Sequence, residues 1–167
     1  EIDQMIKEKD LREMRPQVRY RNGQNITLQV LQNAIRGCAQ ENGIPVAFKS
    51  EQIKYGGLIG GNAVDCIVLY HPEHGTDYFN IAIQVKHQGN YAFVSVNYFG
   101  NSKLLGNLGS HEYLMNTLKN GSDAERLGAL IGAGIRRVVK GGHNSQKLEE
   151  EQNWYSMVSD IFDDIIS

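Results

Sequence analysis

Three polar residues lie at spacings that would bring a carboxylate, an amide and an ammonium group together on a sheet. Asp65 lies inside an apolar run that predicts a strand, and Gln84 and Lys86 alternate with apolar residues in a second strand-like run. If Asp65 faces Ala82 on a neighbouring antiparallel strand, we expect all three side chains on one face. Carboxylate oxygens suit hard divalent cations, and an ammonium group stabilises negative charge that develops on a phosphate. One hypothesis for this face is therefore metal-assisted phosphate chemistry.

A carboxylate on one strand beside a Gln-x-Lys on the next resembles the active site of the Mrr-like branch of the PD-(D/E)xK nucleases. The resemblance covers about residues 60–88, and a helix and a glycine-rich segment precede it. It implies that Asp65 binds a divalent metal such as Mg²⁺, that Gln84 completes the site and that Lys86 assists the attacking water. The chain departs from the family where the Gln-x-Lys strand leads into another hairpin instead of a helix. The nuclease is therefore the alternative hypothesis, and only under it do we expect Mg²⁺ or a nucleic-acid partner.

The same predicted face also carries aromatic side chains among polar ones. Two aromatic residues alternate with apolar residues in the third strand-like run, and two asparagines are expected near them. Such a mixture is typical of surfaces that recognise a protein partner. The binding residues that we expect are Tyr91, Phe93, Asn80 and Asn97. The leading hypothesis is therefore a non-catalytic binding or regulatory domain of a larger protein, without a metal or a cofactor.

Consecutive extended runs predict the sheet that must position these residues. The run over 62–70 is almost continuously apolar, whereas the runs over 78–86 and 91–98 alternate. A fourth strand is expected over 45–48, continuing toward Tyr55. The loop lengths predict that Lys86 faces Tyr91 in the last hairpin. The apolar face that results, on which helices should pack, contains Val64, Cys66, Val68, Phe79, Ile81, Ile83, Val85, Ala92, Val94 and Val96.

Helical spacing of apolar residues predicts one helix before the sheet and three helices after it. Asn25 or Thr27 can cap the first helix, and Gly43 can end it. The three later helices are predicted over 110–118, 122–141 and 145–165. We therefore predict an α+β fold, in which an antiparallel meander of three to four strands has one N-terminal and three C-terminal helices packed on one face. The last helix has an apolar face around Trp154, which offers a surface for a homo-oligomer.

Residues 1–24 are highly charged and contain Pro16, so we expect a short helix and a linker there, followed by a single α+β domain over 25–167. The arginines of this segment fit a solvated linker. The histidines of the segment 71–74 fit a polar hairpin loop better than a metal site. Cys38 and Cys66 are interpreted as small buried hydrophobic residues rather than as a disulfide scaffold.

The composition is that of one ordinary globular domain, because 41% of the 167 residues are hydrophobic and 22% are charged. The net charge of −2 excludes a strongly basic, nucleic-acid-binding composition. No apolar run approaches the roughly 18 residues of a membrane span. We expect a cytoplasmic protein. The chain begins at Glu1 rather than at methionine, which leaves open an upstream targeting or anchor segment.

Overall fold

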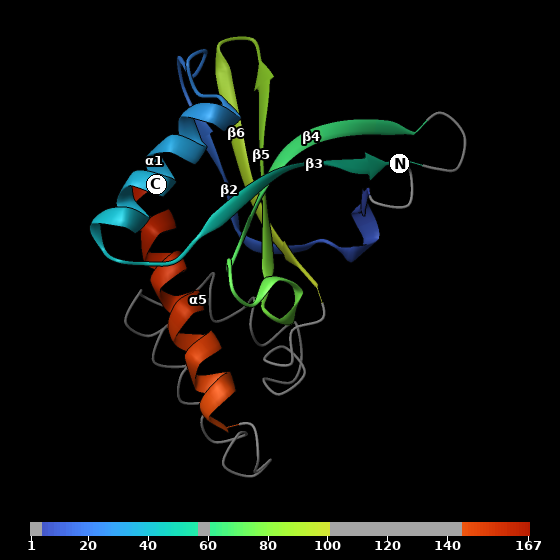
Figure 1. Cartoon of the computed structure of the whole chain (residues 1–167). Coiled ribbons are helices and arrows are strands. Elements are labelled where there is room, and N and C mark those ends of the chain that lie inside the picture. The colour runs from blue at the N-terminus through green and yellow to red at the C-terminus, as the bar shows by residue number, and fades with distance from the viewer. Residues whose placement is uncertain (1–4, 57–60, 101–144) are drawn as a thin grey trace.

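A six-stranded mixed sheet organises the chain in the computed structural model, which describes residues 5–56, 61–100 and 145–167. The strand order is β1-β3-β4-β5-β6-β2, and the pairing of β1 with β3 is the parallel one. Figure 1 labels the strands β2 to β6. The strands are β1 (Ile6–Lys7), β2 (Arg12–Tyr20), β3 (Ala47–Tyr55), β4 (Asn62–Tyr70), β5 (Asn80–Gln88) and β6 (Tyr91–Phe99). The helices are α1 (Leu28–Glu41), α5 (Ser145–Ile165) and the short 3-10 helices η2 (Glu8–Asp10) and η3 (Gly75–Asp77).

The predicted fold class is wrong in its sheet, and the described residues contain two α-helices rather than four. The sheet has six strands rather than three or four, and it is mixed rather than purely antiparallel. The described residues form two α-helices, α1 and α5, at the positions predicted for the first and the last helix. The helices predicted over 110–118 and 122–141 lie outside the described residues.

The additional strands come from the charged N-terminal segment, which we predicted to be a helix and a linker. Residues 12–20 instead form the edge strand β2, paired antiparallel with β6. An edge strand tolerates charge and a proline, because one row of its backbone groups does not join a ladder. Register shifts on both sides of Arg15 accommodate Pro16 within this strand. The prediction failed because Pro16 excludes a helix interior but not an edge strand.

Helix α1 begins and ends where its capping residues predict. The hydroxyl of Thr27 accepts a hydrogen bond from the backbone N–H of Val30, at 3.1 Å. At the other end Gly43 has a φ of 66°, and the N–H of Ile44 donates to the carbonyl of Ala39, at 2.8 Å. This is the Schellman arrangement, in which a glycine accepts the left-handed conformation that stops the helix.

The register of the sheet differs from the expected one in two ways. Lys86 lies opposite Phe93 instead of Tyr91, a displacement of two residues, because the hairpin turns at Gly89 with a φ of 60°. A displacement of two leaves every side chain on its face. The expected register placed Ile67 opposite Asn80, but it lies opposite Ile83, a displacement of three residues. An odd displacement exchanges the two faces of β4.

The helices cover one face of the sheet, and the main core lies between them and the strands. Ile81, Ile83, Val94 and Val96 face the helices as predicted, whereas Ile67 and Leu69 contribute from β4 in place of Cys66 and Val68. Trp154 of α5 is 2% exposed, and its indole N–H donates to the carbonyl of Pro45, at 2.8 Å. The α5 residues buried in this core are Trp154, Tyr155, Val158, Ile161, Phe162 and Ile166.

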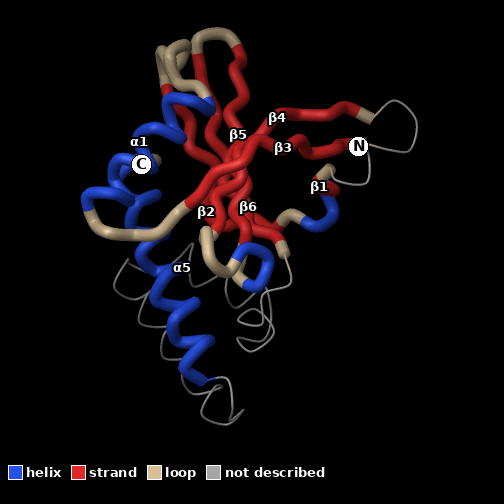
Figure 2. The backbone as a smooth tube through the Cα atoms, viewed as in Figure 1, coloured by secondary structure: helices blue, strands red, loops and turns tan. Residues whose placement is uncertain are grey.

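The sheet curls toward the face that α1 and α5 leave free. Its edges β1 and β2 are five strand spacings apart, which is about 24 Å in a flat sheet. The four residues 8–11 join these edges, and such a connection reaches at most about 17 Å. The edges must therefore approach each other, and Figure 2 shows the chain returning from β1 to β2. We call this side the concave face; its apolar cluster consists of Ile53, Cys66, Val68 and Ala82, with Ile6 and Leu11 packed on it.

Candidate functional site

Three side chains on neighbouring strands form a row across the concave face. Arg19 of β2 pairs with Phe93 of β6, and Phe93 pairs with Lys86 of β5. Residues that pair directly point to the same face, and Phe93 points away from the helices because its neighbour Val94 points toward them. Arg19 and Lys86 are exposed and Phe93 is half-buried. We call Arg19, Phe93 and Lys86 the basic row.

Aromatic rings hold both cations of the basic row in place. The Tyr91 and Phe93 rings are 6.3 Å apart between centroids and 28° from parallel. The Arg19 guanidinium carbon lies 5.6 Å from the centroid of the Tyr91 ring, and Lys86 Nζ lies 5.3 Å from that of Tyr55. Cation–π contacts of this length are attractive and leave the charged groups in water. The described residues give neither cation an ion pair.

Tyr55 links β3 to β5, although β4 lies between these strands. Its hydroxyl donates to Gln84 Oε1 at 2.9 Å, and the Gln84 side chain is buried. Burial raises the pKa of Tyr55 above its ordinary value, and the hydrogen bond to Gln84 opposes this effect. The hydroxyl therefore stays protonated and donates at neutral pH. This contact follows from the curl of the sheet, which brings the Tyr55 end of β3 over β5.

The predicted binding residues differ in accessibility. Tyr91, Phe93 and Asn97 are half-buried and alternate along β6, so they share the concave face. Asn80 is 4% exposed, so it is part of the interior. Beside them, Gln17 of β2 donates from Nε2 to the Ser95 hydroxyl oxygen at 2.9 Å, which ties the edge strand to β6.

The residues behind the nuclease resemblance do not share a face. Ile67 pairs with Ile83, so Asp65 points to the same side as these two residues, whereas Gln84 and Lys86 point to the concave face. Asp65 instead accepts a hydrogen bond from Gln52 Nε2 on β3, at 3.0 Å. Within the described ranges, no group of three or more His, Cys, Asp or Glu side chains is arranged to hold a metal ion.

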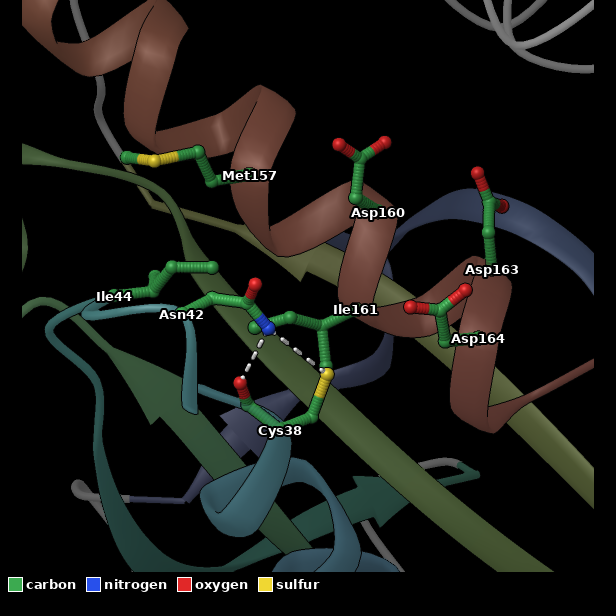
Figure 3. Close-up of a pocket in the computed structure, with 8 residues that line it drawn as sticks. All are labelled: Cys38, Asn42, Ile44, Met157, Asp160, Ile161, Asp163 and Asp164. Carbon is green, nitrogen blue, oxygen red and sulfur yellow. Dashed lines mark hydrogen bonds between the residues drawn. The ribbon is translucent and has the colours of Figure 1, made fainter. Parts of the chain in front are cut away.

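A pocket of about 460 Å³ lies between the end of α1 and helix α5 (Figure 3). Its lining residues are Cys38, Asn42, Ile44, Met157, Asp160, Ile161, Asp163 and Asp164. Burial raises the pKa of the Cys38 thiol, as do the charges of Asp164 and Glu41, so the sulfur is a poor nucleophile at neutral pH. Asp163 is already paired with Arg15 of β2. Burial raises the pKa of Asp160 in the same pocket, as do the charges of Asp163 and Asp164. The Cys38 thiol therefore gives this pocket no activated nucleophile.

The loop between β4 and β5, predicted to be polar, packs against α5. His71 is 7% exposed, and its ring centroid lies 5.4 Å from that of Trp154. Its Nδ1 accepts a hydrogen bond from the backbone N–H of Glu73, at 3.1 Å. Burial lowers the pKa of His71, with a further decrease from the nearby His74. The loop thus contributes to the core instead of forming a separate site.

The apolar face of the C-terminal helix is not available for the homo-oligomer that we expected there. Trp154, Val158 and Phe162 are each at most 2% exposed, because they pack in the main core. Met157 is the large hydrophobic side chain that this helix exposes among the described residues, at 38%.

Sequence reasoning missed two residues of the candidate site. Arg19 was assigned to a linker because Pro16 interrupts its segment, and the alternation of Gln17 and Arg19 with Val18 and Tyr20 was the signal that could have shown a strand. Tyr55 joins the site only through the curl of the sheet, which no local pattern records.

No described helix has the length and the apolar composition that crossing a membrane requires. Comparisons with protein-family models, with curated proteins and with solved structures find no match to this chain.

Proposed function

We propose that this chain is a non-catalytic binding domain that recognises a protein partner through the concave face. The observation that carries the proposal is the basic row, in which Phe93 lies between two exposed cations and stacks near Tyr91. Rings that are only half-buried still have apolar area to remove from water, and aromatic and arginine side chains supply most of the energy of protein interfaces.

The strands make this surface rigid before any partner binds. Phe93 is the third of the nine residues of β6, all of which pair with β5, and Gln17 and Tyr55 connect the neighbouring strands by hydrogen bonds. A side chain held by its surroundings loses less conformational entropy on binding than a free one. The surface therefore has the stiffness that recognition requires.

The free energy that the two rings can contribute to binding indicates how much of the concave face the partner must cover. Burying the area that these two half-buried rings still expose, about 100–150 Å² together, would yield about 3 kcal/mol before the costs of association. Those costs are of similar size or larger, at about 4–15 kcal/mol. The two rings alone cannot hold a partner, so the cations and the amides around them must also make contacts.

A random library of 12-residue peptides displayed on phage tests the proposal. We expect the immobilised wild-type protein to enrich a family of peptides that perturbs the NMR signals of Tyr91, Phe93 and Asn97. Phe93→Thr should lose this binding, because it removes the ring and keeps a residue that strands favour. Val30→Thr is the control, since Val30 is 50% exposed on α1, away from the concave face.

Equal enrichment by the wild type and by Phe93→Thr would contradict the proposal, as would peptides that perturb only α1 or α5. Both variants must show the wild-type fluorescence of Trp154, which is the single tryptophan of the chain. If Phe93→Thr fails this check, Tyr91→Thr takes its place, because it removes the neighbouring ring near the end of the strand.

A further inference from the structure

The charge at the basic row is positive and is not balanced by a described carboxylate beside it. Arg19 and Lys86 are exposed, and no described carboxylate lies within ion-pair distance of either cation. The contrast is Lys49 of β3, which also lies over a tyrosine ring, that of Tyr70, but has its Nζ 3.7 Å from a Glu51 carboxylate oxygen. Glu51 thus neutralises one cation of the concave face, whereas the described residues supply no such carboxylate to the two cations that flank Phe93.

Two acidic residues lie near the ends of this surface. Glu13 is opposite Asn97, four residues along β6 from Phe93. The charge of Glu8 acts on the Tyr55 hydroxyl and contributes to its raised pKa. Neither acid interrupts the basic row, so a ligand that lies over Phe93 meets two positive charges first.

The spacing of the row defines what can bridge it. Arg19 and Lys86 belong to strands two spacings apart, so their Cα atoms are separated by about 9.6 Å. An extended peptide advances about 3.3 Å per residue and its side chains alternate between two sides, so acids four positions apart point to the same side, about 13 Å from each other. The exposed side chains of Arg19 and Lys86 are long enough to span the remaining few ångströms. A side chain between those acids lies over the Phe93 ring.

We propose that the partner presents an extended acidic peptide segment, in which an apolar or aromatic side chain lies midway between two carboxylates four residues apart. Arg19 and Lys86 each receive one carboxylate, and the intervening side chain packs on Phe93 and Tyr91. This inference rests on the proposed function, since it names the chemistry of the partner at the same surface.

The same charges favour a peptide over a nucleic acid. A single strand bound through two cations would release only about one or two counterions, which gives weak binding. The whole chain carries a net charge of −2, which repels a long polyanion more strongly than a short acidic segment. Carboxylates at two positions match the two available cations.

The peptide library provides the test. We expect peptides enriched by the wild type to contain Asp or Glu on both sides of an apolar or aromatic residue. The double variant Arg19→Glu/Lys86→Glu should enrich Lys or Arg at those positions instead, because the charge of the row is reversed. A synthetic consensus peptide should bind Arg19→Gln/Lys86→Gln about tenfold more weakly than the wild type, as expected for two exposed charge pairs.

Matched controls separate this effect from general electrostatics. Lys49→Gln removes an exposed cation over a tyrosine ring on the same face, yet it should leave the affinity within about twofold, because Glu51 already neutralises Lys49. Replacing the acids of the consensus peptide by their amides should weaken binding as much as the double Gln variant does. Glu8→Gln should strengthen it.

The outcomes distinguish this inference from the proposed function. Peptides without acids that bind through Phe93 would overturn the inference and leave the proposed function standing. No enriched peptide at the concave face would overturn both. Tighter binding of a twelve-residue oligouridine than of the acidic peptide, lost in Arg19→Gln/Lys86→Gln, would show that the partner is a nucleic acid and would also overturn the inference. An equal loss with Lys49→Gln would mean non-specific attraction and would count against it.

Discussion

Two glycines of this chain should respond in opposite ways to the same substitution. Gly23 follows β2 and is buried, and a Cβ atom placed on it would lie 2.6 Å from the Ala92 Cβ and 2.9 Å from the Ala92 backbone nitrogen. Gly37 lies inside α1, and an added Cβ atom there would meet nothing within 4 Å. The two variants therefore compare a glycine that is required by the close approach of two backbones with a glycine at an ordinary helix position.

The magnitudes follow from these contacts. Gly23→Ala requires β6 or the turn to move, because the Ala92 backbone cannot rotate away, and overpacking of this kind costs about 1–3 kcal/mol. Gly37→Ala should increase the free energy of unfolding by about 0.5–1 kcal/mol, since alanine loses less backbone entropy in a helix than glycine. The two variants should therefore differ by about 1.5–4 kcal/mol.

Urea unfolding followed by the fluorescence of Trp154 measures both effects, because this single tryptophan is 2% exposed in the core. With a slope of about 2 kcal/mol per molar urea, the midpoint of Gly23→Ala should fall by about 1 M, while that of Gly37→Ala rises slightly. The reasoning would be refuted by a Gly23→Ala midpoint equal to that of the wild type, or by a lower midpoint for Gly37→Ala.

Gly23 also bears on the candidate site. Its N–H donates to the Asn90 carbonyl at 2.8 Å, and His87 Nε2 lies 3.2 Å from its carbonyl oxygen. These contacts fasten the end of β2 to the β5–β6 hairpin and so hold Arg19 beside Phe93. Hydrogen exchange of the Arg19 and Tyr20 amides should therefore be faster in Gly23→Ala and unchanged in Gly37→Ala.

Three other substitutions test single contacts of the core and of the concave face. Burial lowers the pKa of His71, so the folded protein favours the neutral imidazole. The contribution of His71 to the free energy of unfolding is therefore complete above about pH 6.5 and is lost as the pH falls through the folded-state pKa. Chemical denaturation between pH 7.5 and 5 should show this loss in the wild type and a flatter profile in His71→Gln. Trp154→Phe removes the donor to Pro45 and should lower the free energy of unfolding by about 1–3 kcal/mol, read by circular dichroism; no change would mean that water replaces the indole. Tyr55→Phe leaves the buried oxygen of Gln84 without this donor and should cost about 1–2 kcal/mol in the same assay, whereas an unchanged midpoint would argue against the link between β3 and β5.

The elements that were predicted correctly are those with a complete local signal. Helix α1 has its cap at Thr27 and its stop at Gly43, both set by contacts within a few residues. Strands β5 and β6 alternate, so the faces of Phe93 and Val94 followed from the period of two even though the hairpin register was displaced by two residues.

Strand β4 shows where local patterns stop being informative. Its run from Cys66 to Leu69 is buried on both faces, so either set of alternate residues could have faced the helices. The register of its pairing with β5 determines which residues face the helices, and these are Ile67 and Leu69. The separation of Asp65 from Gln84 and Lys86 follows from that pairing alone.

The sequence by itself determined the capped helix α1, the positions of three central strands and the set of aromatic and polar residues on β6. Only the tertiary structure decided that residues 12–20 close one edge of the sheet, because an edge strand has a weak pattern and its partner lies far along the chain. The curl that follows from the short connection between β1 and β2 brings Tyr55 over β5. The basic row combines both kinds of information: Lys86 and Phe93 meet within the local β5–β6 hairpin, whereas Arg19 joins them only through the long-range pairing of β2 with β6.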